Sequence, residues 1–237
     1  MKNQYYADVN DYRKYGLLRC VARDPSVRLG VCWMLTPDDG RTDGRFTSYA
    51  STPIKWRHYD PSLFDSLAAF LGSGAAREVF HASRSGILPN ALFFEALLKD
   101  DRALREGYFA EMSRALAQAS LIFFDPDNGL EISSSPPGSR GSSKYLYWAE
   151  LEKAYSLGHS VLVYQHFPRV VRNLFIQKVV ADLEARLAGA EVHALRTSYV
   201  AYFLAAHAKH GPSIRAGLRT LSQSWAGQID LLSRLSA

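Results

Sequence analysis

The stretch Leu121-Ile-Phe-Phe-Asp-Pro-Asp-Asn-Gly129 constrains the fold of this chain more than any other. Its four apolar residues predict a short strand that is buried on both faces. Pro126 has no N–H for a sheet, so the strand must end at the Asp-Pro step. Asp125, Asp127 and Asn128 therefore follow the carboxyl end of a central strand, which is where open α/β sheets bind ligands. The alternative is a surface turn with no function.

Two other apolar runs end in similar polar residues. Leu29–Leu35 leads into Thr36-Pro-Asp-Asp-Gly40, and Ser160–Tyr164 leads into Gln165-His-Phe-Pro-Arg169. On neighbouring parallel strands, Asp38 and Asp39 would reach the same crevice as the Asp-Pro turn. A histidine at such an edge is a candidate for polarising or protonating a substrate.

The complete pattern predicts a single α/β domain over residues 1–237, with a mostly parallel central sheet flanked by helices. The polar site is expected at the carboxyl ends of the strands. Strands are expected near 29–35, 79–82, 120–125, 160–164, 192–196 and 199–205. Helices are expected near 61–71, 93–98, 101–119, 145–156, 171–187 and 213–233, with another after an N-cap at Asn10 or Asp11.

Charge and composition permit a nucleic-acid partner. The net charge is +5 and the sequence pI is about 9.2, which suits DNA binding without requiring it. Cys20 and Cys32 form no disulfide framework, as is usual in a reducing compartment. The sequence also shows no leader peptide or membrane span, so a soluble cytoplasmic protein is expected.

Two irregular segments, 33–60 and 133–144, are expected to be functional loops. The second contains many Ser, Gly and Pro residues and two cations, so it is either a linker or a loop that holds phosphates. Aromatic residues among cations near the N-terminus can stack on bases. The predicted DNA-binding residues are Asp38, Asp39, Arg41, Arg45, Tyr12, Arg13, Arg140, Ser142, Ser143, Lys144, Tyr145, Gln165, Phe167 and Arg169.

The absence of several known motifs limits the reactions that this sequence can be expected to catalyse. The sequence contains no P-loop, no strand-linked G-x-G-x-x-G, no zinc-type Cys/His cluster, no EF-hand and no nucleophile elbow. Carboxylates, one amide and one histidine remain. This set suits hydrolysis, with Asp125 and Asp127 activating water, Asn128 orienting the substrate and His166 stabilising negative charge. No metal ligand is assigned.

Two family resemblances involve these residues. Asp125-Pro126-Asp127-Asn128 and His166-Phe167-Pro168-Arg169 resemble the Asp-Pro and His-Pro loops of uracil-DNA-glycosylase-like base-excision enzymes. The Gly-Gln before the Asp-Pro is missing, and the spacing between the loops is shorter. This resemblance implies a cofactor-free glycosylase that flips a modified base out of DNA and excises it, with antiviral defence against phage as its setting.

The second resemblance is to ribosomal-RNA adenine N6-methyltransferases. Asn10-Asp-Tyr-Arg-Lys-Tyr-Gly-Leu-Leu18 is similar in placement to their N-terminal helix, and Asp125-Pro126 falls where they carry Asp-Pro-Pro-Tyr. It implies S-adenosylmethionine (SAM) as cofactor, although Thr36-Pro-Asp-Asp-Gly40 replaces the glycine-rich loop.

The glycosylase is the favoured interpretation, with the methyltransferase as its alternative. A metal-dependent nuclease and a non-catalytic nucleic-acid-binding module also remain open. The nuclease would use an oxygen-ligand cage formed by Asp38, Asp39, Asp43, Asp125, Asp127 and Glu131.

Overall fold

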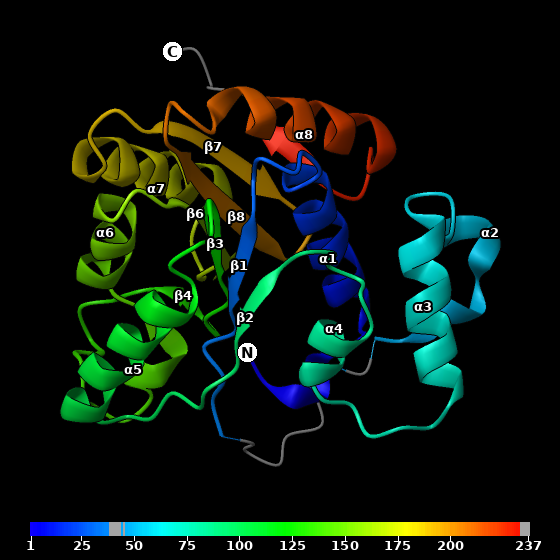
Figure 1. Ribbon diagram of the computed structural model, residues 1–237, viewed down its shortest axis with the longest axis horizontal. Helices are drawn as coiled ribbons and strands as arrows, with labels where there is room; N and C mark the ends of the chain where they lie inside the picture. The colour runs from blue at the N-terminus through cyan, green and yellow to red at the C-terminus, as the bar shows by residue number, and fades with distance from the viewer. Residues whose placement is uncertain (38–43, 45, 233–237) are drawn as a thin grey trace.

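The computed structural model describes residues 1–37, 44 and 46–232, and a three-layer α/β arrangement emerges from them (Figure 1). Within these residues a seven-stranded sheet runs in the order β2-β1-β3-β6-β8-β7-β9, and a separate two-stranded sheet pairs β4 with β5. The strands are β1 (Leu29–Cys32), β2 (Leu92–Phe94), β3 (Leu121–Phe124), β4 (Gly129–Leu130), β5 (Tyr145–Leu146), β6 (Ser160–His166), β7 (Glu191–Arg196), β8 (Val200–Ala206) and β9 (Asp230–Leu232).

The central strands are parallel. β1 pairs in parallel with β2 and β3, and β3 pairs in parallel with β6. β8 lies antiparallel between β6 and β7, and β9 pairs antiparallel with β7. The predicted mixed α/β fold with a mostly parallel central sheet is confirmed. The suspected hairpin is β7 and β8.

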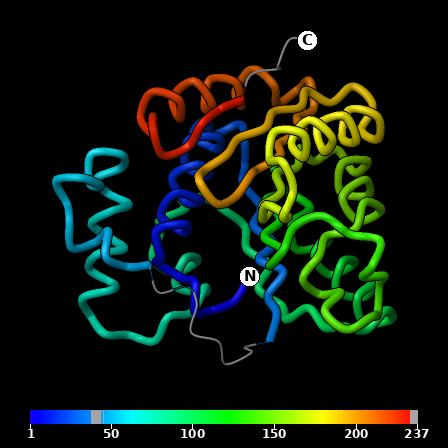
Figure 2. The backbone as a smooth tube through the Cα atoms, turned by 180° about the vertical axis from the view of Figure 1, so that it is seen from behind, coloured from blue at the N-terminus to red at the C-terminus, as the bar shows by residue number. Residues whose placement is uncertain are grey.

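Helices cover both faces of the sheet (Figures 1 and 2). One apolar core joins α1, α3 and α8 to one face, and a second joins α5, α6 and α7 to the other. The helices are α1 (Val9–Val21), α2 (Pro53–Trp56), α3 (Pro61–Gly72), α4 (Phe80–Arg84), α5 (Arg102–Ala115), α6 (Trp148–Ser156), α7 (Arg172–Arg186) and α8 (Gly211–Ser224), with short 3₁₀ turns η1 (Asn3–Tyr5), η2 (Ser48–Ser51) and η3 (Ser142–Lys144).

Two glycines let α1 and α8 approach each other closely. A Cβ on Gly16 would lie 2.0 Å from the ring of Trp225, and one on Gly217 would lie 2.3 Å from the carbonyl oxygen of Cys20. Neither position has room for a side chain. Helix α1 is therefore held rigidly between α8 and the sheet.

The strand order reverses between β1 and β3. The chain leaves β1 to form β2 on one side, and then returns to form β3 on the other side of β1. Such a switch point opens a crevice at the carboxyl ends of the two strands, and ligands of open α/β sheets bind there. The residues that follow β1 and β3 therefore border the natural site of this fold.

Several predicted elements were wrong. Residues 79–82 lie in and just before α4, and the strand that pairs with β1 is Leu92–Phe94, where a helix was expected. Both runs are short and apolar, so periodicity alone does not separate helix from strand. The last predicted helix ends at Ser224 and gives way to β9, and Tyr145–Leu146 is a strand that precedes α6.

The start of α1 also differs from the prediction. Asp8 is the N-cap, and its carboxylate accepts hydrogen bonds from the backbone N–H groups of Asn10 and Asp11. An acidic residue at this position satisfies N–H groups that have no partner inside the helix. In the described part of the chain, no helix is both long enough and apolar enough to cross a membrane.

Candidate functional site

A buried ion network lies at the switch point and connects α1 to the end of β3. The Lys14 ammonium is 2.9 Å from Asp11 Oδ1 and 2.7 Å from Asp125 Oδ2. The Tyr15 hydroxyl donates to Asp11 Oδ2 at 3.0 Å. All four side chains are buried. Each polar group therefore needs its partner, because an unpaired charge in this position would be costly.

The electrostatics of the network favour a charged lysine. Burial alone would lower the pKa of Lys14, but the carboxylates of Asp11 and Asp125 raise it well above its ordinary value. Burial raises the pKa of Asp125, and the attraction of Lys14 only partly offsets this effect. The carboxylate of Asp125 is thus committed to an ammonium and sealed from solvent at 1% exposure.

Asp127 is held by different partners. Its carboxylate lies 2.7 Å from the amino group of Met1, and it accepts a 2.7 Å hydrogen bond from the Thr36 hydroxyl. Burial would raise the pKa of Asp127, but these partners more than offset it, and the pKa lies below its ordinary value. The Thr36 contact joins the residues after β1 to those after β3, across the switch point.

A small cavity, here called the polar hollow, opens over this network. It has a volume of about 60 Å³, and its lining includes Lys14, Asp125, Asp127, Tyr164 and His166. That volume is enough for about two water molecules. The polar hollow can therefore hold a small group of a substrate, and a whole nucleoside would have to extend beyond it.

A larger cavity, the aromatic hollow, lies on the other side of His166. It measures about 380 Å³, within the range of small-molecule sites. Asn128 lines it, and within the described residues the side-chain amide of Asn128 makes no hydrogen bond. The lining also includes three residues that were predicted to bind DNA, Tyr145, Gln165 and Phe167. Trp148, which was not predicted, lines it as well.

His166 connects the two hollows. Its Nε2 lies 3.3 Å from the Tyr164 hydroxyl at the end of β6. Desolvation is the main cause that lowers the pKa of His166 below its ordinary value. A neutral imidazole at neutral pH follows, and such a ring offers one donor and one acceptor.

Gln165 has a structural role that the sequence did not reveal. Its side chain accepts from the Leu130 N–H at 2.8 Å and donates to the carbonyl oxygens of Asn128 and His166 at 3.1 and 2.7 Å. Gly129 passes so close that a Cβ there would lie 2.3 Å from the Gln165 amide. Gln165 thus fixes the Asp-Pro-Asp-Asn loop against β6, and its amide is fully used.

The predicted phosphate-binding loop is occupied by the protein itself. The backbone N–H groups of Gly141 and Ser143 donate to the Asp100 carboxylate at 2.6 and 2.7 Å, and the Ser142 hydroxyl is 3.4 Å from it. Ser142 and Ser143 are buried. The predicted phosphate-binding role of Ser142 and Ser143 is therefore corrected, because their loop already binds the Asp100 carboxylate of the chain itself.

The other predicted residues are dispersed. Tyr12 is fully buried, and its hydroxyl donates to the Trp56 carbonyl, so it is a packing residue. Arg13 donates to Gln228. Arg140 and Arg169 are exposed, and Lys144 is half-buried. Asp38, Asp39, Arg41, Asp43 and Arg45 lie outside the described residues.

A metal site is not formed by the carboxylates that the structure describes. Among residues 1–37, 44 and 46–232, no group of three or more potential ligands has the necessary geometry. Asp125 and Asp127 have cationic partners, and Glu131 accepts from the Trp148 N–H at 2.9 Å. The described part of the proposed oxygen-ligand cage is therefore already committed to other partners.

Sequence reasoning missed Lys14, Asp8 and Asp11. The signal was present, since Asp11 and Lys14 stand three residues apart on the same face as the apolar residues of the helix. Charged residues on such a face indicate a buried pair or a site. Glu95, at the carboxyl end of β2, was also missed. It is exposed and, among the described residues, has no hydrogen-bond or ion-pair partner.

Comparison with known proteins finds a similarity to solved structures. The chain is similar to the crystal structure of human methyltransferase-like protein 13 in complex with SAH, at 15% identity and a TM-score of 0.36, covering 89% of this chain and 91% of that chain. No protein-family model matches the chain, and no curated protein matches it. A likeness this low does not assign the chain to a family.

The glycosylase prediction is corrected. Asp125, which would have had to activate water, is buried under Lys14 and paired with its ammonium group. A general base needs direct reach to the proton that it removes. Base excision, abasic-site formation and the associated phage-defence setting are therefore withdrawn.

Proposed function

We propose that the chain is a SAM-dependent methyltransferase that modifies an amine of a nucleic-acid base. One observation carries the proposal. The two segments that resemble adenine N6-methyltransferases are the N-terminal helix and the Asp-Pro loop, and they meet through Lys14 and Asp125 at 2.7 Å. Their contact lies at the switch point of the sheet, where this class of fold binds ligands.

Methyl transfer suits the buried state of Asp125. When bound, SAM supplies an electrophilic methyl group, so no water has to be activated. The work left to the protein is to position a neutral amine, which is largely a matter of orientation. Lys14 and Gln165 hold the Asp-Pro-Asp-Asn loop rigidly enough for that task.

Glu95 is the residue that fits a nucleoside-bearing cofactor. It follows β2, whose Phe94 is opposite Cys32 of β1, so it stands beside the switch point. In related open sheets, an acidic residue at the end of the neighbouring strand accepts hydrogen bonds from ribose hydroxyls. The free carboxylate of Glu95 is chemically suited to this role. The small size of the polar hollow means that the nucleoside would have to bind over the ends of β1 and β2.

The aromatic hollow suits the target base. Trp148 and Phe167 offer ring surfaces for stacking, and the free amide of Asn128 can accept from or donate to the edge of a base. His166 lines both hollows, so a base in the aromatic hollow can direct its amine towards the polar hollow. In this proposal, Asn128 and His166 orient the acceptor.

The surface beside this hollow suits a nucleic-acid strand. Arg169 is exposed, and the Arg172 guanidinium lies 4.9 Å from the ring centre of Phe167. The Ser198 carbonyl accepts a hydrogen bond from Arg172. Tyr199, the next residue, is 65% exposed. Cations interleaved with exposed rings are typical of surfaces that follow a single strand.

The test is transfer of a labelled methyl group. Purified protein is incubated with SAM that is radiolabelled in the methyl group and with unmodified RNA or DNA, and label in the nucleic acid is counted. Digestion to nucleosides then identifies the modified base. We expect incorporation into one nucleic acid, with N6-methyladenine as the product that the resemblance favours.

Three variants sharpen the test. Asn128→Ala should reduce turnover by at least tenfold, and Glu95→Ala should raise the KM for SAM. Glu111→Ala, on the exposed face of α5, is the matched control and should leave both unchanged. No incorporation into any nucleic acid, together with no binding of SAM, would refute the proposal.

A further inference from the structure

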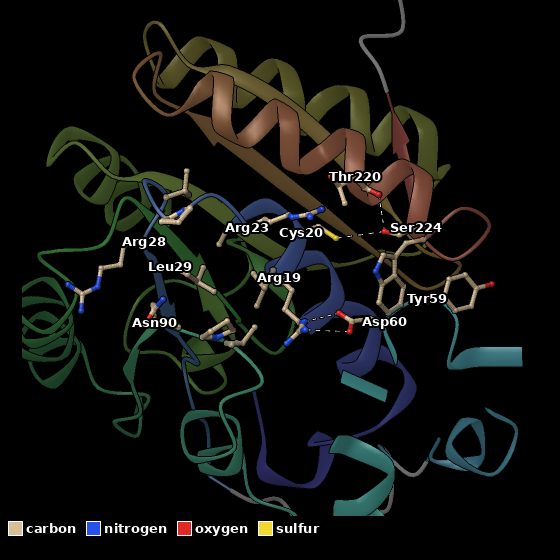
Figure 3. Close-up of a pocket in the computed structure, with 18 residues that line it drawn as sticks. Arg19, Cys20, Arg23, Arg28, Leu29, Tyr59, Asp60, Asn90, Thr220 and Ser224 are labelled. Atoms are coloured by element: carbon tan, nitrogen blue, oxygen red, sulfur yellow. Dashed lines mark hydrogen bonds and ion pairs between the residues drawn. The ribbon is translucent and has the colours of Figure 1, made fainter. Parts of the chain in front are cut away.

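A third cavity, the arginine hollow, lies at the amino ends of the strands, whereas Asp125 lies at their carboxyl ends. It measures about 730 Å³, which is within the range of ligand sites. Its walls come from the second half of α1, the segment before β2, the N-cap of α3 and the end of α8 (Figure 3). Leu29, the first residue of β1, lies in the lining, whereas Asp125 follows the last residue of β3.

The lining has an excess of positive charge. The lining contains three cations, Arg19, Arg23 and Arg28, and one carboxylate, Asp60. Arg19 pairs with Asp60 at 2.7 Å, which neutralises that carboxylate. The lining thus keeps a formal charge of +2, and Figure 3 shows Arg23 and Arg28 outside the Arg19–Asp60 pair.

The two remaining cations lack acidic partners. The Arg23 guanidinium makes no hydrogen bond or ion pair with any described residue, and the residue is exposed. Arg28 donates to the neutral amide of Gln118 at 2.6 Å. Asp24, next in sequence, accepts instead from Ser213 and Ser26. A binding anion would therefore meet guanidinium groups without first displacing a carboxylate.

The walls are rigid. Arg19 donates to Asp60, to the Ser62 hydroxyl at 2.8 Å and to the Ile87 carbonyl at 2.8 Å. One side chain thus connects α1, the start of α3 and the segment before β2. Asn90 within that segment has a left-handed backbone, with φ of 59°. Preformed walls reduce the ordering that a ligand must impose.

The rest of the lining is apolar and aromatic. Leu18, Val27 and Leu88 are buried and form part of the floor, and Tyr59 stacks on Trp225 with ring centres 5.4 Å apart. Tyr59 is only half-buried, so part of its surface stays available. An apolar surface beside unpaired guanidinium groups suits a ligand with a ring system at one end and a negative charge at the other.

We infer that the arginine hollow binds an organic anion with an aromatic body, of the chemical class of a nucleoside monophosphate. The phosphate contacts Arg23, and Asn90 supplies a polar group near the ring. The site is separate from the one proposed for methyl transfer. The inference is independent of that proposal, because binding in the arginine hollow requires neither SAM nor Asp125.

The experiment is a calorimetric titration of the full chain with adenosine monophosphate, adenosine and inorganic phosphate, each added separately. The monophosphate should bind more tightly than either of its parts. Arg23→Ala should weaken its binding by at least tenfold, the factor expected from loss of a charge-assisted contact. Arg114→Ala, an exposed arginine on α5, is the matched control and should leave binding unchanged.

A second variant separates binding in the cavity from binding at the surface. Ala91→Trp fills the cavity without changing its charge and should abolish binding, with melting temperatures used to confirm folding. Three outcomes would overturn the inference. They are no binding of the monophosphate at millimolar concentration, equal binding by wild type and Arg23→Ala, or equal affinity for monophosphate and inorganic phosphate. A Glu95→Ala variant should bind the monophosphate normally, which keeps this result distinct from SAM binding.

Discussion

The ammonium of Lys14 lies 2.7 Å from the carboxylate of Asp125, although the two residues are 111 positions apart in sequence. This contact attaches the middle of α1 to the residue that ends the central strand β3. Both groups are buried, so each charge depends on the other for its stabilisation, and the pair also holds α1 against the end of β3. It holds a rigid Asp-Pro loop at the switch point, beside Asn128 and His166, to which the proposed function gives the orientation of the substrate.

Removal of Lys14 from the buried pair should destabilise the folded protein. Lys14→Met leaves Asp11 and Asp125 buried without a cation, and should lower the free energy of unfolding by about 3–5 kcal/mol. Denaturant unfolding measures this loss. Adding Asp125→Asn to Lys14→Met should recover part of the stability, because one unpaired charge is removed. A single variant as stable as wild type would show that the ion pair is absent in solution.

The N-cap of α1 should make stability depend on pH. Burial first, and then repulsion by Asp11, raise the pKa of Asp8 from 3.8 to about 7. Between about pH 4 and 7 the folded state therefore holds a proton that the unfolded state has released. The contribution of Asp8 to the free energy of unfolding is fully present below about pH 4 and is lost as the pH rises through about 7.

Asp8→Asn keeps an oxygen that can cap the helix but removes the titration. Melting temperatures of wild type and Asp8→Asn should be compared at half-unit steps from pH 4 to 8. The decline across this window should be shallower in the variant. Identical slopes for the two proteins would mean that Asp8 titrates at its ordinary value.

The contact between α1 and α8 should not tolerate a methyl group. Gly217→Ala would place a Cβ 2.3 Å from the Cys20 carbonyl oxygen, so the helices must move apart. We expect a loss of about 1–3 kcal/mol in unfolding free energy. Gly107→Ala is the matched control, because Gly107 is helical with open space around its Cβ position.

The control should change stability in the opposite direction. Alanine in an exposed helix is favoured over glycine by about 0.5–1 kcal/mol, so Gly107→Ala should stabilise the protein slightly. If Gly217→Ala behaves in the same way, α1 and α8 are farther apart than the structure indicates.

Asp100 should hold the loop that follows β4. Asp100→Ala removes the acceptor for the Gly141 and Ser143 N–H groups, and these amides should exchange with solvent roughly tenfold faster. The corresponding control is Asp65→Ala, since Asp65 pairs with Arg57 on the exposed surface. Unchanged exchange at both amides would mean that other contacts hold the loop, among them Arg105, whose guanidinium donates to the Ser142 and Tyr145 carbonyls.

The sequence predicted the centre of this molecule better than its periphery. The buried strand at 121–124 and its Asp-Pro end follow from four apolar residues and one proline, which leave little choice. The segments 79–82 and 92–94 were exchanged between helix and strand, because short apolar runs carry no decisive period. Strand β9 was missed because its partner, β7, is distant in sequence.

The site was only partly accessible to the same reasoning. Asn128 and His166 were predicted because each follows the end of an apolar run that indicates a strand, and their roles stay predictions. Lys14 was not found, because its role depends on a contact with a residue 111 positions away. Ser142 and Ser143 were assigned to a ligand because the sequence does not show that Asp100 reaches their loop first. Local pattern identifies groups that can bind an anion, but tertiary structure decides which anion they bind.

The most direct test of the central claim is calorimetric titration of the protein with SAM in the presence of a metal chelator. We expect saturable binding at one site and at least tenfold weaker binding by Glu95→Ala, with binding by Glu111→Ala unchanged. Absence of binding by the folded wild-type protein would contradict a SAM-dependent function. Equal binding by wild type and Glu95→Ala would contradict the position assigned to the cofactor at the ends of β1 and β2.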